Sequence, residues 1–383
     1  SVERGEIQIT GKGMDASRTD YTDIIARSVK INAGIWAQDL KVTTGRNNVD
    51  IAHGQIEKKT GDVSSQPQMA LDVASLGGMY AGKIRLVGTE TGVGVRNAGH
   101  IGAQAGAVTL TADGRIENSG SISAKTDVHL ATTRELHNSG SVYAGQDTQI
   151  QSNGVFTHTG SVASRHNTRI QTARLTGGER SLLAAGVKDD GRLAAAGNLT
   201  VSTTGELAAH GQVLSGGDMQ LKGQGLDLSN SRIQGQHTGL DAGSGNLSTQ
   251  NAQLSAGTLS ARTAGQFSNN GGTINADTLQ ISAQSLSNRK GSLIQTGTGD
   301  FSLNLPGGVD NREGLLAANG AVRLDALSLD NRRGKVRAAQ PGSLQVRTTG
   351  AVDNQQGSLI ASRDILINTQ ALNNDNGLIS AAA

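Results

Sequence analysis

Two consecutive stretches of the sequence decide the fold: VTLTADGRIENSGSISAKTD, residues 108–127, and VHLATTRELHNSGSVYAGQD, residues 128–147. They match position by position, and the match extends over 97–170. Each period carries three apolar positions, offset by 6, 6 and 8 residues. The three sets are Leu110, Leu130, Ile150 and Ile170; Ile116, Leu136 and Phe156; and Ile122, Val142 and Val162. Self-similarity at a fixed period of about 20 residues is the sequence signature of a repeat architecture.

The spacing within one period predicts strands rather than helices. Val108 and Leu110 alternate with polar neighbours, which is the two-residue period of a strand. The run that begins at Ile116 ends at Asn118-Ser-Gly120, a turn sequence, so it is too short for a helix. Three short strands within one period cannot pair with one another, but each can pair with the same strand one period later. The sequence therefore predicts an all-β fold, a right-handed parallel β-helix with coils of about 20 residues.

A related pattern near the C-terminus defines a further region. The phrase apolar-x-Asn-x-x-Gly begins at Leu286, Val309, Leu329, Val352 and Leu372, at intervals of 23, 20, 23 and 20 along the chain. We expect four regions: 1–96, regular repeats over 97–172, looser and shorter coils over 173–265 with a loop at about 182–191, and repeats with Asn-x-x-Gly turns over 266–383. Pro67 and its polar surroundings predict an excursion over about 54–80, interpreted as a hairpin packed on the outside of the β-helix.

Asparagine stands at the same place in these repeats, just before glycine. Asparagine tolerates a left-handed backbone and bonds to its own turn. When coils stack, its amide can also bond to the amides of the coils above and below. We therefore predict a structural turn ladder rather than a binding site, formed by Asn97, Asn118, Asn138, Asn269, Asn288, Asn311, Asn331, Asn354 and Asn374.

Composition argues against several classes of function. The chain has no cysteine, which removes disulfides, cysteine-ligated zinc and thiol catalysis. Lys and Arg number 34 against 32 Asp and Glu, spread along the chain, so there is no electrostatic case for a nucleic-acid partner. The eight histidines form no tight pair. The glycine-rich run 77–83 lacks the hydroxyl that a phosphate loop needs after its lysine, so we interpret it as a turn. We expect no cofactor and no metal.

Stacked acidic and basic residues leave two interpretations open. Asp310, Asp330 and Asp353 would lie on one edge of the β-helix. One interpretation is a carboxylate cluster that binds calcium or cleaves a polysaccharide. The other, which we favour, is a turn ladder whose acidic charges are balanced by basic residues. The balancing residues would be Arg289, Arg312, Arg332 and Arg333. Arg289, Arg312, Arg332 and Arg337 could also form a basic strip for a sulfated glycan, although exposed charges commonly protect strand edges.

Several phrases resemble a known family of bacterial exoproteins. Residues 21–35 (YTDIIARSVKINAGI) and 40–47 (LKVTTGRN) look like the later part of a two-partner secretion domain. Residues 77–87 (GGMYAGKIRLV) and 92–99 (GVGVRNAG) resemble its closing stretch, and the repeats from Asn97 onward are similar to filamentous haemagglutinin repeats. The early Asn-Pro-x-Gly motifs, a signal peptide and a Val-Glu-Asn-Asn boundary motif are absent from the sequence. The resemblance therefore suggests an internal piece of a longer protein.

The resemblance implies a function in a large Gram-negative exoprotein. Members include filamentous adhesins and the stick proteins of contact-dependent growth inhibition, exported through the periplasm and an outer-membrane β-barrel transporter of the two-partner secretion type. We expect a non-enzymatic rod segment, secreted or on the cell surface, that presents a distal adhesive or toxin region to target cells. A β-helical polysaccharide lyase or hydrolase, and a module that binds a receptor or glycan directly, are the alternatives. The isolated chain is also expected to associate end to end through exposed strand edges.

Overall fold

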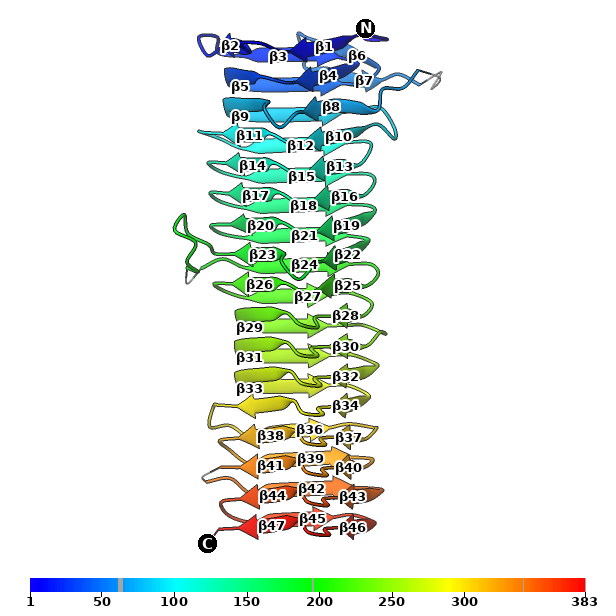
Figure 1. The fold of residues 1–383 in the computed structure, drawn as a ribbon, viewed down its shortest axis with the longest axis vertical. Coiled ribbons are helices and arrows are strands. Elements are labelled where there is room, and N and C mark those ends of the chain that lie inside the picture. Colours follow the sequence, from blue (N-terminus) through cyan, green and yellow to red (C-terminus); the bar gives the residue numbers. More distant parts are fainter. Residues whose placement is uncertain (61–64, 195, 340, 383) are drawn as a thin grey trace. The chain divides into compact units, whose positions relative to one another are not determined.

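The structure, a computed structural model, describes residues 1–60, 65–194, 196–339 and 341–382. Every regular element in these residues is a β-strand, labelled in Figure 1. The chain divides into two units, Ser1–Gly197 and Asn198–Ala383. Among the described residues, no helix is long and apolar enough to cross a membrane.

Three strands form each regular coil of the first unit. One coil consists of β12 (Val108–Ala112), β13 (Ile116–Asn118) and β14 (Ser121–Ala124), and the next of β15 (Val128–Thr132), β16 (Leu136–Asn138) and β17 (Ser141–Ala144). Each strand pairs in parallel with its equivalent one coil later, with Leu110 opposite Leu130 and Ile122 opposite Val142. The predicted parallel β-helix and its period are confirmed, whereas its handedness stays a prediction.

The same pairing continues on both sides of these coils. Towards the C-terminus of the unit lie β18 (Thr148–Ser152), β19 (Val155–His158), β20 (Ser161–Ser164), β21 (Thr168–Thr172), β22 (Arg174–Gly177) and β23 (Leu182–Ala185). Towards the N-terminus lie β1 (Glu6–Ile9), β2 (Met14–Ala16), β3 (Thr22–Ala26), β4 (Ser28–Ile31), β5 (Gly34–Thr44), β8 (Met69–Val73), β9 (Gly78–Gly88), β10 (Gly94–Asn97) and β11 (His100–Ala103).

An antiparallel hairpin leaves the β-helix near the N-terminus, as predicted, but at other residues. It consists of β6 (Asn47–Asp50) and β7 (Gln55–Lys58). The predicted bounds of 54–80 are wrong, because β8 and β9 belong to the coils: β8 pairs with β4 and β9 pairs with β5. Residues 61–64, which fall within the predicted excursion, lie outside the described residues.

The predicted loop at 182–191 is also displaced. Residues Leu182–Ala185 form β23, whose first two residues pair with Ser161 and Val162 of β20. The loop follows this strand and is closed by an isolated bridge between Val187 and Leu193. Leu183 is 1% exposed, so burial of the leucine and its alanine neighbours keeps this run in the coil.

The second unit repeats the arrangement with strands of more variable length. Its strands are β24 (Leu199–Thr203), β25 (Leu207–Ala209), β26 (Gln212–Ser215), β27 (Met219–Lys222), β28 (Leu226–Asp227), β29 (Arg232–Asp241), β30 (Leu247–Ser248), β31 (Gln253–Arg262), β32 (Gln266–Ser268), β33 (Thr273–Ser282), β34 (Ser285–Ser287), β35 (Ser292–Gln295), β36 (Phe301–Asn304), β37 (Val309–Asp310), β38 (Leu315–Ala318), β39 (Val322–Ala326), β40 (Leu329–Asp330), β41 (Lys335–Ala338), β42 (Leu344–Thr348), β43 (Ala351–Asp353), β44 (Ser358–Ala361), β45 (Ile365–Asn368), β46 (Ala371–Asn373) and β47 (Leu378–Ala381).

Register in the second unit follows the Asn-x-x-Gly phrases. Leu286 lies opposite Val309, Val309 opposite Leu329, and the series continues to Leu372. The coils before them are not loose: β29 and β31 are long strands that pair in parallel from Arg232–Gln253 to Asp241–Arg262. Each of these long strands joins two strand positions of a coil without an intervening turn.

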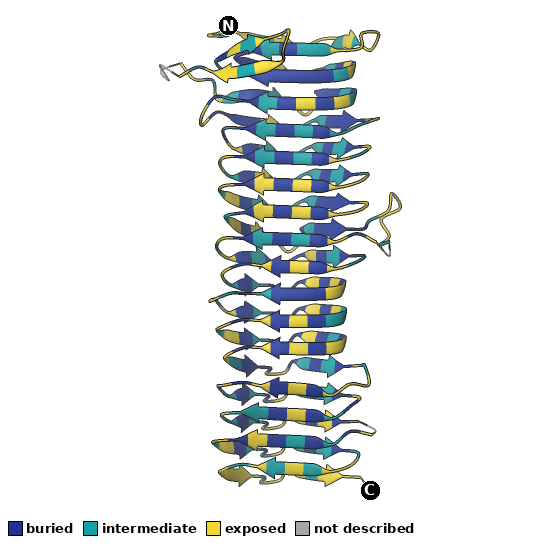
Figure 2. Cartoon of the chain, turned by 180° about the vertical axis from the view of Figure 1, so that it is seen from behind, coloured by how far each residue is buried: buried dark blue, intermediate teal, exposed yellow. Residues whose placement is uncertain are grey.

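The core of each unit is a set of aliphatic columns, that is, residues at equivalent positions on consecutive coils. Leu110, Leu130 and Ile150 are at most 1% exposed, and Phe156 is completely buried. Figure 2 shows the alternation of buried and exposed residues along the strands. Because parallel in-register strands bring like positions together, the apolar columns stay inside from coil to coil until the last coil, where Leu372 is 45% exposed.

Candidate functional site

Three of the predicted asparagines form a continuous amide chain in the first unit. Nδ2 of Asn97 donates to Oδ1 of Asn118 at 2.8 Å, and Nδ2 of Asn118 donates to Oδ1 of Asn138 at 2.8 Å. Each Nδ2 also donates to a main-chain carbonyl of the next coil, that of Ser121 at 3.1 Å for Asn97 and that of Ser141 at 3.2 Å for Asn118. These three side chains are buried, so their polar atoms are satisfied by one another and by the backbone.

The other six predicted asparagines form a second amide chain, in the second unit. Nδ2–Oδ1 distances of 2.6 to 2.8 Å join, in order, Asn269, Asn288, Asn311, Asn331, Asn354 and Asn374. Each amide also donates to the glycine carbonyl that closes its own turn, as Asn288 does to Gly291 at 3.2 Å. In both chains the Nδ2 donor faces the coil that follows in sequence. In each amide chain the Oδ1 of the first asparagine therefore needs a donor from outside the chain, and the Nδ2 of the last asparagine needs an acceptor.

Both amide chains have an end residue that supplies the missing partner. Oγ1 of Thr249 donates to Oδ1 of Asn269 at 2.8 Å, and Nδ1 of His158 lies 3.2 Å from Nδ2 of Asn138. The coil after His158 has Gly177 at the same position, which carries no side-chain acceptor. The predicted ladder, which contains only asparagines, left out both end residues, although each lies one period from an asparagine.

His158 is the one titratable side chain of the first amide chain. It is completely buried, its Nε2 lies 2.9 Å from the carbonyl oxygen of Leu182, and its ring is tilted against that of Phe156 with centroids 5.3 Å apart. Burial lowers the pKa of His158, because the charged ring loses its hydration, and the contacts with Leu182 and Asn138 oppose this shift only in part.

The ladder asparagines are not left-handed, which corrects one reason given for their choice. In the second unit, positive φ occurs instead two residues after the asparagine, at Lys290 (55°), Glu313 (57°), Arg333 (56°), Gln356 (55°) and Asn376 (51°). Side-chain hydrogen bonds hold the asparagine in place, and the turn residue two positions after it adopts the strained left-handed conformation. For a non-glycine residue this conformation costs about 1–2 kcal/mol.

The acidic residues of the second unit form an alternating chain with arginines. Arg289 binds Asp310 at 2.5 Å, Arg312 lies between Asp310 at 2.8 Å and Asp330 at 3.4 Å, and Arg332 continues the chain from Asp330 at 2.7 Å to Asp353 at 3.7 Å. Desolvation raises the pKa of Asp310, but hydrogen bonds from Arg312 and Arg289 outweigh it and hold the pKa below its usual range. These carboxylates therefore face guanidinium groups, the arrangement expected of a charge-balanced turn ladder.

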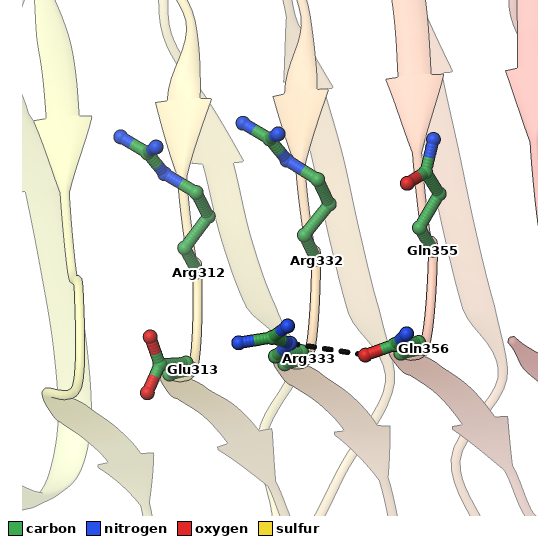
Figure 3. Close-up of a pocket in the computed structure, with 6 residues that line it drawn as sticks. All are labelled: Arg312, Glu313, Arg332, Arg333, Gln355 and Gln356. Atoms are coloured by element: carbon green, nitrogen blue, oxygen red, sulfur yellow. Dashed lines mark hydrogen bonds between the residues drawn. The ribbon is translucent and has the colours of Figure 1, made fainter.

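A shallow hollow lies beside this charge chain. In Figure 3, Arg312, Arg332 and Gln355 form one row on consecutive coils, and Glu313, Arg333 and Gln356 form a second row. Nε of Arg333 donates to Oε1 of Gln356 at 3.0 Å, so Arg333 does not balance an aspartate, contrary to the prediction. The mixture of one acidic, three basic and two amide side chains gives no strongly cationic surface.

An aromatic strip, Trp36, Tyr80 and His100, occupies consecutive coils of the first unit. The rings of Trp36 and Tyr80 are nearly parallel, at 14°, with centroids 6.0 Å apart, and those of Tyr80 and His100 are 5.2 Å apart. Trp36 is 42% exposed. Exposed aromatic rings in line are a feature of surfaces that contact planar or ring-shaped ligands. No sequence pattern pointed to this strip, because Trp36 and Tyr80, although opposite each other, are more than two periods apart in sequence, and His100 is not at the position opposite Tyr80.

Glycines make room for each ring of the aromatic strip. A Cβ at Gly34 would overlap the Trp36 ring, a Cβ at Gly78 would come within 2.8 Å of Tyr80, and a Cβ at Gly102 would overlap His100. The glycine-rich run 77–83 is therefore explained by strand β9 and its ring contact rather than by the predicted turn.

Two family models match consecutive parts of the chain. The TPS secretion domain matches residues 1–118, beyond the predicted limit at residue 96. The haemagglutinin repeat matches 121–202, 189–271, 254–304, 296–355 and 317–383. No solved structure matches the chain.

Curated relatives share these regions. Toxin CdiA of Yersinia pestis is 42% identical over 320 residues, which are 83% of this chain and 10% of that protein. The tRNA nuclease CdiA-2 of Burkholderia pseudomallei is 44% identical over 124 residues, 32% of this chain and 4% of that protein. The 16S rRNA endonuclease CdiA of Enterobacter cloacae is 41% identical over 115 residues, 30% and 3% respectively.

Together, the stacked coils, the repeats and these matches identify the family. The haemagglutinin-repeat matches run from residue 121 to 383, well over half of the chain, and the TPS secretion domain precedes them. The chain spans about a tenth of the Yersinia relative. It belongs to the haemagglutinin-repeat family, among the secreted, cell-surface two-partner secretion exoproteins of Gram-negative bacteria.

Proposed function

We propose that this chain is a non-enzymatic rod segment of a large exoprotein, which presents a distal adhesive or toxin region to target cells. The observation that carries the proposal is the in-register stacking of coils within each unit, reinforced by amide chains that fix one register. Such coils resist bending and sliding because each is bonded along its whole length to its neighbours.

The comparisons also support a scaffold rather than an enzyme. Segments of the chain match relatives named tRNA nuclease and 16S rRNA endonuclease, at 44% and 41% identity. A segment shared by proteins with different named activities does not select between those activities. We therefore assign any effector chemistry of the parent exoprotein to residues other than these.

The TPS secretion domain implies an outer-membrane β-barrel transporter of the two-partner secretion type as the partner in export. We propose that emerging coils fold onto coils that are already outside, so that burial of each apolar column draws the chain outward. The regular register permits this addition of one coil at a time.

Charged substitutions in one buried column test this mechanism. Leu110→Asp, Leu130→Asp and Ile150→Asp together should strongly reduce secretion of the full exoprotein with its transporter, measured by immunoblot of the culture medium. The control is Thr109→Asp, His129→Asp and Gln149→Asp, which change outward positions of the same strands. The mechanism would be contradicted if the column variant were secreted as well as wild type while hydrogen exchange showed that its coils are disordered.

A second candidate function, direct binding of a glycan, is favoured by the aromatic strip alone. Aromatic rings pack against the C–H face of a sugar ring, and the Trp36 ring is open to solvent. On this proposal Trp36→Ala and Tyr80→Ala abolish binding of the chain to a glycan array, whereas Trp36→Phe retains part of it. Equal binding by wild type and Trp36→Ala would remove this candidate.

We also propose that the chain by itself associates end to end. Leu372 and Leu378 in the last coil are 45% and 52% exposed, and strand β47 has an unpaired edge among the described residues. Light scattering after size exclusion should show apparent mass rising with concentration, and Leu378→Lys should suppress the rise. A constant monomer mass at all concentrations would contradict this.

A further inference from the structure

We propose that His158 is a pH-sensitive joint in the first unit: a neutral ring holds the coils that meet at it, and protonation opens them. This device goes beyond the rod function proposed above, because it makes one place in an otherwise uniform stack respond to acid. It rests on the position of the ring at the end of the first amide chain.

The hydrogen-bond network assigns one neutral tautomer to this ring. Nδ1 accepts from Nδ2 of Asn138 at 3.2 Å, and Nε2–H donates to the carbonyl oxygen of Leu182 at 2.9 Å. Leu182 lies opposite Ser161, whose carbonyl accepts from the amide of Asn138 at 3.2 Å. The Nε2–H of His158 therefore takes the place of the amide N–H that an asparagine would direct at the same carbonyl.

A protonated ring no longer accepts from the preceding asparagine, whose Nδ2 keeps only the carbonyls of Gly140 and Ser161. Nδ1–H would face the Nδ2–H of Asn138, which places two donors together in a buried site. Turning the Asn138 amide over does not relieve the conflict, because its Nδ2 would then face the donor of Asn118. Relief by turning would have to pass through the whole chain to Asn97 and would lose the bonds that these amides make to main-chain carbonyls.

No neighbouring charge favours the protonated ring. The groups that face it are the side-chain amide and main chain of Asn138 from β16, Gly177 from β22, the Leu182 carbonyl from β23 and the Phe156 ring from its own strand. None of them titrates, and no charged side chain contributes to the shift in its pKa. The main-chain hydrogen bonds with Leu182 and Asn138 favour the protonated ring, but the cost of burying its charge outweighs them.

The direction of the pH effect follows from the lowered pKa. An open coil binds a proton near the ordinary histidine pKa of about 6.5, whereas the closed coil binds it only at lower pH. The closed state is therefore fully favoured above pH 6.5 and loses stability as the pH falls below that value. One pH unit below it raises the opening equilibrium by at most about tenfold.

Native-state hydrogen exchange of the full chain tests the proposal. Between pH 7.5 and 5.5, after correction for intrinsic exchange, opening of β19, β20 and β23 should increase, by at most about tenfold. His158→Asn, which restores an amide that fits both neighbours, should abolish the increase. His137→Asn, the same change at the adjacent exposed histidine of β16, should retain it.

Two results would overturn the proposal. One is an unchanged pH dependence in His158→Asn, and the other is an opening equilibrium of these strands in wild type that does not change with pH. A measurement on the unaltered chain covers the case in which the variant fails to fold. In histidine-labelled wild type, NMR should show the His158 ring neutral, with its proton on Nε2, just below pH 6.5. A His158 ring that is protonated in the closed coil at that pH contradicts the proposal.

Discussion

Asn331 lies in the middle of the second amide chain, and its two neighbours depend on it. Its Oδ1 accepts from Asn311 at 2.8 Å and its Nδ2 donates to Asn354 at 2.7 Å. Asn331→Ala leaves the buried Oδ1 of Asn354 without its donor and removes one acceptor of the Asn311 amide, which keeps the carbonyls of Gly314 and Lys335. A buried polar atom without a partner costs about 1–3 kcal/mol, so we expect the free energy of unfolding to fall by about 1–3 kcal/mol in urea titrations. Asn304→Ala, at an exposed strand position of the same unit, should change it by less than about 0.5 kcal/mol.

Gln355 and Gln356 form a matched pair of turn residues that differ in backbone conformation. Gln356 has a φ of 55°, whereas Gln355 is not among the residues with positive φ. Gln356→Gly should stabilise the chain by a few tenths to about 1 kcal/mol, because glycine adopts this conformation without strain. Gln355→Gly should destabilise it by about 0.5–1 kcal/mol through added freedom of the unfolded chain. Thermal unfolding by calorimetry measures both, and a loss of stability in Gln356→Gly would contradict the argument from strain.

At the scale of elements, a buried ion pair joins two coils that lie on either side of the hairpin in sequence. Arg27, between β3 and β4, binds Glu90 after β9 through two hydrogen bonds of 2.8 and 3.1 Å, and its Nη1 donates to Ser65 at 3.1 Å. Both ionised side chains are about 7% exposed. The pair thus joins segments that the hairpin separates in sequence.

Removal of one partner should be more harmful than removal of both. Glu90→Ala leaves a buried guanidinium without its carboxylate, and we expect a loss of about 3–5 kcal/mol in the free energy of unfolding. Arg27→Met combined with Glu90→Leu should lose much less, because no unpaired charge stays buried. Urea unfolding of the three proteins is the measurement, and equal losses in the single and double variants would show that the charge pair is not what matters.

At the scale of the molecule, damage within a unit should stay near its origin. Leu324 is completely buried and lies between Leu303 and Val346. Leu324→Asp should abolish hydrogen-exchange protection in β36, β39 and β42, yet leave β25 and β28 of the same unit protected, since each coil contacts only its neighbours. Ser302→Asp, at an exposed position of β36, is the control. Loss of protection throughout the second unit would contradict this expectation.

The repeat could be predicted from sequence because its determinants recur at one fixed period, as Leu110, Leu130 and Ile150 show. The bounds of the hairpin could not be predicted, because nothing in the run Met69–Val73 distinguishes a coil strand from a hairpin strand. Only its pairing with β4, which precedes the hairpin in sequence, places it in a coil. The same insertion brings Trp36 opposite Tyr80, more than two periods later, which hid the aromatic strip from any search for a fixed period. Burial, rather than local sequence, likewise placed Leu182–Ala185 in a coil.

The common direction of the amides has a consequence for how such genes can grow. Copying one whole coil inside a run of asparagines leaves every donor facing an acceptor, so unequal recombination can lengthen the array without a compensating substitution. A copy that includes His158 breaks this rule, because the second imidazole would meet no amide donor at its Nδ1. Duplication of coils that carry asparagine is therefore compatible with the amide chain, whereas duplication of the coil that carries His158 is not.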